Sequence, residues 1–111
     1  MKKTIPLLLL FFFVVLYAIT MARGLSWAYD SADAGDLIAA IATGGVPHPG
    51  GYPTYITFAA LFAKLPFGEL ALRTNLFSML SMLGAVFIAY QLVEKLTHKP
   101  FVALLATLLF G

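Results

Sequence analysis

Three aspartates and a histidine stand close together in this sequence, and their side chains can move protons or bind cations. Asp30, Asp33 and Asp36 are three residues apart, which on a helix would place them on one broad face. Carboxylates crowded in this way raise one another's pKa or share a cation. His48 stands between two prolines that restrict the backbone. An imidazole held there could bind a phosphate or carry a proton near neutral pH.

The same aspartates also fit a purely structural role. Asp33, followed three residues later by Asp36 and then by an apolar stretch, is typical of a helix N-cap with a second acid in the first turn. The spacing alone favours capping over catalysis or metal binding, although a cap also fixes where a carboxylate points. A divalent metal held by Asp33 and Asp36 stays an open alternative, and no cofactor is certain.

Arg73 and Asn75 form a second group of interest, at the start of a long apolar run. A guanidinium at that point anchors a helix at the headgroup layer, and it can also bind a phosphate through two parallel hydrogen bonds. Asn75 is two residues further on and could add a hydrogen bond to the same phosphate.

Composition places these residues in a membrane protein. The chain is 61% hydrophobic and 11% charged, against about 45–50% and 25% in soluble domains. The net charge of +2 is too small to indicate nucleic acid as a partner. Cysteine is absent, which excludes a disulfide framework and a thiolate metal site.

The apolar runs and their breaks predict an all-α protein. We expect a first transmembrane helix at 4–22, an exoplasmic loop at 23–70, a second transmembrane helix at 71–93, a cytoplasmic turn at 94–99 and the start of a third helix at 100–111. Two short helices are expected inside the loop, one over 34–43 that ends at Gly44 and one from 53 or 54 to 65 that stops at Pro66. The second is about 18 Å long, so it suits a helix lying in the membrane interface.

Basic residues predict the orientation of the chain. Two short segments on one side of the membrane carry Lys2, Lys3, Lys95 and Lys99. The long loop on the other side carries Arg23, Lys64 and Arg73. The positive-inside rule then places the N-terminus in the cytoplasm and the acidic loop outside. We expect an integral, multi-pass protein of a bacterial plasma membrane or an endomembrane. Because the last apolar run is too short to span, we also expect an N-terminal part of a longer protein.

Several motifs, taken in order, resemble one membrane family. They are Asp33-Ala34-Gly35-Asp36, then Val46-Pro47-His48-Pro49-Gly50-Gly51-Tyr52-Pro53, and then Arg73-Thr74-Asn75. The resemblance covers about residues 24–90. The family was long described as a domain of unknown function, includes an animal protein O-mannosyltransferase and many bacterial multi-pass proteins, and is similar to the GT-C class of glycosyltransferases.

The resemblance implies a polytopic, GT-C-like helical fold and an inverting glycosyltransferase. Such an enzyme transfers a sugar, with mannose as one candidate, from a polyprenyl-phosphate donor to a hydroxyl group of a protein or glycan acceptor. Asp33 would act as the general base, and Asp36 would orient Asp33 or hold a metal. Arg73, His48 and Asn75 would contact the donor phosphate.

The sequence departs from the family pattern in two motifs. It has Asp33-Ala34-Gly35-Asp36 where the family usually has Asp-Ser-Gly-Glu, and Gly50 stands where the family usually has a second proline. The shorter carboxylate arm bears more on the role of Asp36 than on that of Asp33.

Three other functions compete with the enzyme. The first is a transporter or lipid-handling protein in which the carboxylates bind a cation or a proton. The second is a small, non-enzymatic membrane assembly protein. The third is a secreted protein cut near residue 22, for which the basic start followed by an apolar run would be a signal peptide.

Overall fold

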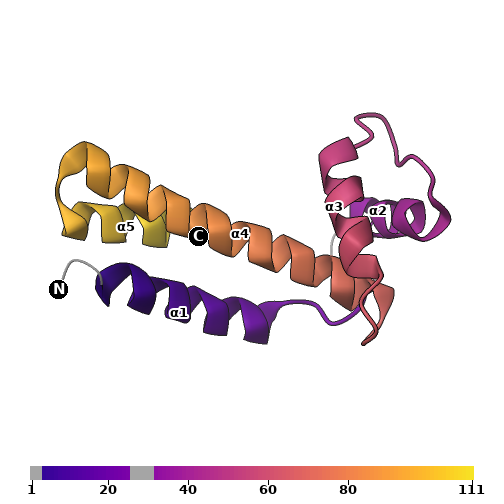
Figure 1. Ribbon diagram of the computed structural model, residues 1–111, viewed down its shortest axis with the longest axis horizontal. Coiled ribbons are helices and arrows are strands. Elements are labelled where there is room, and N and C mark those ends of the chain that lie inside the picture. Colours follow the sequence, from indigo (N-terminus) through magenta and orange to yellow (C-terminus); the bar gives the residue numbers. More distant parts are fainter. Residues whose placement is uncertain (1–3, 26–31) are drawn as a thin grey trace. The chain divides into compact units, whose positions relative to one another are not determined.

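A computed structural model describes residues 4–25 and 32–111, and the regular secondary structure in these ranges is helical (Figure 1). The helices are α1 (Thr4–Thr20), α2 (Ala32–Thr43), α3 (Pro53–Ala63), α4 (Leu70–Thr97) and α5 (Pro100–Phe110). The prediction of an all-α protein is confirmed for this part of the chain. Asp30, Lys2 and Lys3 lie outside the described residues, and so do the predictions that rest on them.

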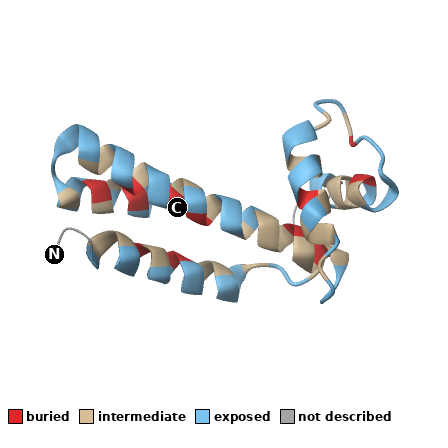
Figure 2. Cartoon of the chain, viewed as in Figure 1, coloured by how far each residue is buried: buried red, intermediate tan, exposed pale blue. Residues whose placement is uncertain are grey.

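One compact unit is formed by Met1–Thr20 together with Met79–Gly111. Its core comes from all three of its helical segments, with Phe13 from α1, Val86 and Tyr90 from α4, and Ala103 from α5. These residues are 2% exposed or less, and the buried positions lie on the sides of the helices that face one another (Figure 2). Pro100 opens α5 at its first helical position, where the missing N–H leaves no hydrogen bond unmade.

The outward side chains of this unit are large and apolar. Leu8, Phe11 and Ile19 of α1 are 64%, 67% and 75% exposed. Water-soluble monomers rarely present a contiguous apolar surface of this kind, whereas lipid solvates it. Within the described ranges, α4 is the one helix whose length and composition suffice to cross a membrane, and α1 and α5 are apolar but shorter.

The long helix extends further than the sequence predicted. α4 runs from Leu70 to Thr97, so the turn expected at 94–99 is reduced to residues 98 and 99. Gln91, Glu94 and Lys95 are polar, but glutamine, glutamate and lysine are good helix formers. The polar side chains at these positions therefore mark the end of the apolar stretch but not the end of the helix. His98, with a φ of 55°, ends the helix instead.

The second compact unit is Met21–Ser78. It holds α2, α3 and the first turns of α4. Tyr55, Phe58 and Phe62 of α3 contact the ring of Phe77, with centroids 5.6, 6.3 and 5.3 Å away. Spacings of three and four residues put these side chains on one side of α3. The aromatic contacts therefore fix α3 against the start of α4.

Candidate functional site

The carboxylates of the candidate site are carried by α2, and a glycine turn ends that helix. Gly44 has a φ of 68°, and the N–H of Gly45 donates to the carbonyl of Ala40 over 3.0 Å. This six-residue closure is a Schellman motif, which needs a left-handed residue at the position of Gly44. The predicted end of this helix at Gly44 is confirmed, and the chain turns back there toward the helix it has left.

The loop that follows holds His48 by an unusual run of backbone angles. Gly50, Gly51 and Tyr52 have φ values of 114°, 61° and 41°, and for a side chain as large as that of Tyr52 this conformation is strained. The N–H of Gly51 donates to the carbonyl of His48 over 3.1 Å, and the N–H of Tyr52 donates to that of Gly50 over 2.7 Å. The Tyr52 ring meets the His48 ring edge-on at 5.3 Å.

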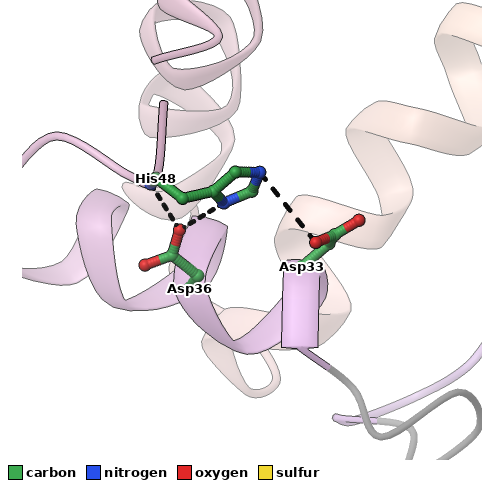
Figure 3. A network of polar contacts seen from close by, with 3 residues as sticks. All are labelled: Asp33, Asp36 and His48. Atoms are coloured by element: carbon green, nitrogen blue, oxygen red, sulfur yellow. Dashed lines mark hydrogen bonds and ion pairs between the residues drawn. The ribbon is translucent and has the colours of Figure 1, made fainter. Parts of the chain in front are cut away.

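His48 lies between the two aspartates of α2, as Figure 3 shows. Its backbone N–H and its ring Nδ1 both lie 2.7 Å from the same oxygen of Asp36, Oδ2. Its Nε2 points the other way and is 3.9 Å from Oδ1 of Asp33. The side chains of His48, Asp36 and Asp33 are 37%, 41% and 84% exposed. Asp36 is thus engaged twice by His48, whereas Asp33 is open to solvent.

The structure changes the structural role predicted for Asp33. α2 begins at Ala32, so Asp33 lies inside the first turn of the helix and is not the N-cap residue. An acid in the first turn still interacts favourably with the helix dipole. The carboxylate at Asp36 binds a backbone N–H of the next loop and not the N–H groups of its own helix. The two aspartates therefore share a face, as predicted, but the capping pair is not formed.

The contacts with His48 change the acidity of Asp36. Hydrogen bonds from the backbone and then from the side chain of His48 stabilise the ionised carboxylate, and they hold the pKa of Asp36 below its ordinary value of 3.8. Because the pKa is lowered, the contact with His48 contributes its full stabilisation of the fold when the pH is above the ordinary pKa of 3.8. This stabilisation is lost as the pH falls through the lowered pKa of Asp36.

We therefore expect the Asp36 carboxyl group to titrate below pH 3.8. The ¹³C resonance of this carboxyl group, followed from neutral to acid pH, measures the midpoint directly. The backbone amide resonance of His48 should move with the same midpoint, because that N–H loses its acceptor when Asp36 is protonated. A midpoint at or above the ordinary value would mean that the two hydrogen bonds do not persist in the membrane protein.

Arg73 is engaged by the backbone at the end of α3. Its Nη1 donates to the carbonyls of Ala63 and Leu65, and its Nε donates to the carbonyl of Glu69 over 3.4 Å. The last carbonyls of a helix lack partners within the helix, and a cation there also complements the dipole. Arg73 therefore fixes the C-terminal end of α3. Among the described residues, no contact joins Arg73 to the group of His48, Asp33 and Asp36.

Replacing Arg73 with alanine should destabilise the protein by about 1–3 kcal/mol, because two carbonyls of a half-buried site would lose a charged donor. Thermal unfolding of the purified protein in detergent would measure the loss. Lys64→Ala is the matched control, since it removes a positive charge from the same end of α3 but from an exposed side chain. Equal losses in the two variants would show that charge alone matters.

Asn75 connects two segments that are far apart in the sequence. Its side-chain Nδ2 donates to the carbonyl of Ala22 over 2.9 Å. This bond ties the segment after α1 to the start of α4, inside the unit Met21–Ser78. All five residues predicted for the site belong to that unit. The structure brings three of them together and gives Arg73 and Asn75 backbone partners of their own.

The described residues contain no group of three acidic, histidine or cysteine side chains arranged to hold a metal ion. A shallow hollow of about 520 Å³ lies on the same loop. It is lined by Pro53, Ile56 and Thr57 of α3 and by five loop residues, Gly45, Val46, Pro47, Gly50 and Gly51. None of the five predicted site residues is in its lining, so the hollow and the Asp–His group are different parts of the loop.

The contact between Asp36 and His48 is the feature that sequence reasoning missed. The residues between Gly44 and His48 are few, and such a short return segment could have indicated that His48 folds back onto α2. Tyr52 was also missed as a neighbour of His48. Its place just before Pro53 gave no sign of the left-handed backbone that carries its ring there.

Comparison with known proteins gives one family and one curated relative. Residues 33–107 match the model of the Protein O-mannosyl-transferase TMEM260 N-terminal domain, and the match includes all five predicted site residues. Protein O-mannosyl-transferase TMEM260 of Mus musculus is 39% identical over 71 residues, which is 63% of this chain and 9% of the mouse protein. No solved structure matches the chain. The family resemblance read from the motifs is confirmed.

Proposed function

Because this chain belongs to the TMEM260 N-terminal domain family of protein O-mannosyl-transferases, we propose that it carries part of the active site of a membrane glycosyltransferase. The enzyme transfers a sugar, with mannose as the first candidate, from a polyprenyl-phosphate donor to an acceptor hydroxyl group on the exoplasmic side. It acts with inversion, as GT-C enzymes do. The observation that carries this proposal is the open carboxylate of Asp33, held beside His48 within the matched region.

Asp33 is the carboxylate best suited to act as the general base. Its side chain is 84% exposed, so an acceptor can approach it. Asp36 already accepts two hydrogen bonds from His48 on Oδ2, and a carboxylate with its pKa lowered in this way is the weaker base. In the reaction, the acceptor hydroxyl gives its proton to Asp33 while its oxygen bonds to the anomeric carbon of the sugar.

The leaving group needs a partner for its growing negative charge. The bond from the anomeric carbon to the phosphate oxygen breaks, and the lipid phosphate keeps the electron pair. A guanidinium has five N–H donors, and the bonds to the carbonyls of Ala63, Leu65 and Glu69 use three of them. In the described part of the chain, the two donors on Nη2 of Arg73 then remain for a phosphate. Asn75, two residues further along α4, lies on another side of the helix, and its Nδ2 donates to the carbonyl of Ala22.

The position of Arg73 on α4 suits a lipid-linked donor. α4 is the candidate membrane span and begins at Leu70, so Arg73 lies in its first turn. The phosphate of a polyprenyl donor stays at headgroup depth, which is where the end of a span and its cations are found. We do not assign His48 to the phosphate, because its Nδ1 faces Asp36 and its Nε2 faces Asp33.

A transfer assay tests this function. Membranes that contain the intact gene product are incubated with polyprenyl-phosphate mannose carrying a radioactive sugar, and label in membrane protein and glycan is measured. Transfer from the lipid-linked donor but not from a nucleotide sugar is the expected result. Transfer from neither donor, together with cation- or proton-dependent transport in the same vesicles, would favour the transporter instead.

A further inference from the structure

One oxygen of Asp36 receives both the backbone and the side chain of the same histidine. The backbone N–H and the ring Nδ1 of His48 each lie 2.7 Å from Oδ2. The two contacts fix the position of the residue and the rotation of its ring together. An ionised carboxylate only accepts hydrogen bonds, so at this distance the ring nitrogen must be the donor. A lone pair on Nδ1 would face the charged oxygen and be repelled.

This contact decides which nitrogen of a neutral His48 carries the proton. When Nδ1 is the donor, Nε2 has a lone pair and accepts a proton. Nε2 is the atom that points to Oδ1 of Asp33, 3.9 Å away (Figure 3). That separation is too long for a direct hydrogen bond, but a hydroxyl group between the two atoms could reach both. The highly exposed side chain of Asp33 is also free to rotate toward Nε2.

The loop holds the ring from its other side. The ring of Tyr52 meets that of His48 edge-on at 5.3 Å, and Pro47 is buried. Among the described residues, the imidazole thus meets two carboxylates and one phenol ring, and Tyr52 is held by its left-handed backbone. Strained backbone of this sort persists where its surroundings fix a side chain. A Tyr52 ring that only contacted solvent would not need this strained backbone.

We infer that Asp36 is a positioning residue, which keeps the proton of neutral His48 on Nδ1 and thereby directs the Nε2 lone pair toward Asp33. The inference rests on the proposed function for its use in catalysis. There, the acceptor proton passes from the acceptor oxygen to Asp33 and then to Nε2 of His48. The resulting imidazolium keeps its Nδ1–H on Asp36, whose negative charge stabilises it, and Asp33 is ionised again. Nε2 then releases its proton to water, so that neutral His48 is also restored before the next turnover.

The position of the proton can be measured without any transfer reaction. The protein is labelled with ¹⁵N-histidine and placed in lipid nanodiscs, and the ring nitrogen shifts are recorded at a pH where the imidazoles are neutral. The chain has two histidines, and His98 serves as the internal reference. We expect His48 to carry its proton on Nδ1, and His98 to show the mixture typical of a solvated imidazole.

Three variants test which carboxylate sets the tautomer. In Asp36→Ala, the ratio of the Nδ1–H to the Nε2–H form of His48 should fall roughly three- to tenfold, as expected for a solvent-screened, charge-assisted bond. Asp36→Glu, which keeps the charge on a longer arm, should restore most of the ratio. Asp33→Asn is the matched control and should leave the proton on Nδ1. Two results would overturn the inference. One is a wild-type His48 with its proton on Nε2, and the other is a ratio that changes in Asp33→Asn but not in Asp36→Ala.

The wild-type spectrum decides the question even if Asp36→Ala does not fold. The two proposals also fail in different ways. If His48 holds its proton on Nδ1 but no sugar is transferred, the glycosyltransferase proposal fails and the positioning contact stands. If sugar is transferred but His48 holds its proton on Nε2, the positioning role is wrong and the enzyme stands.

Discussion

Asp33→Asn should lower the rate of sugar transfer by about 10²–10⁴-fold, the usual contribution of a positioned general base. The substitution removes the proton-accepting oxygen and keeps the size and shape of the side chain. The position is exposed, with 84% of the side chain open to solvent, so the fold should not suffer. The measurement is the initial rate of label transfer from the polyprenyl-phosphate donor, corrected for the amount of protein in the membrane.

Glu94→Gln is the matched control for Asp33→Asn. It makes the same change of one negative charge, but it lies near the far end of α4, in the other compact unit. Its rate should equal that of the wild type, and both variants should insert into the membrane. Unchanged turnover in Asp33→Asn would remove Asp33 from the mechanism. A loss of turnover in both variants would point to net charge rather than to a base.

Much of the fold could be predicted because local rules decide it. The end of α2 at Gly44 and the start of α3 at Pro53 follow from residues with fixed backbone preferences. The end of α4 could not be predicted in the same way. Glu94 and Lys95 mark the end of an apolar stretch, but they are compatible with helix, so the helix continues to Thr97.

The candidate site, too, could be predicted only where local rules decide it. Asp33 and Asp36 share a face of one helix, and the sequence spacing predicts this. The contact of His48 with Asp36 depends on the path of the loop that carries His48, with positive φ at Gly44 before it and at Gly50, Gly51 and Tyr52 after it. The partners of Arg73 depend on where α3 stops relative to α4. Both are tertiary facts, and the residue types alone indicated only that a cation or an imidazole was available.

The second large effect concerns the side of the membrane on which the acidic loop lies. Orientation was predicted from the distribution of lysine and arginine, and the chemistry requires the loop and the lipid-linked donor on the same side. Residues 1–111 contain no cysteine, so single cysteines can be placed in this part and their labelling compared with that of the unsubstituted protein, which measures the background. Val46 is 84% exposed on the loop, and Thr97 is exposed at the end of α4.

We expect Val46→Cys to react with a membrane-impermeant maleimide in intact cells, and Thr97→Cys to react only after the membrane is permeabilised. The difference should be nearly all-or-none, because the reagent does not cross the bilayer and the predicted topology puts the two positions on opposite sides of the membrane. Each variant labelled after detergent treatment provides its own maximum. If Val46→Cys is protected in intact cells and labelled after permeabilisation, the acidic loop faces the cytosol. Asp33 and Arg73 would then have no access to an exoplasmic donor, and the proposed reaction could not take place there.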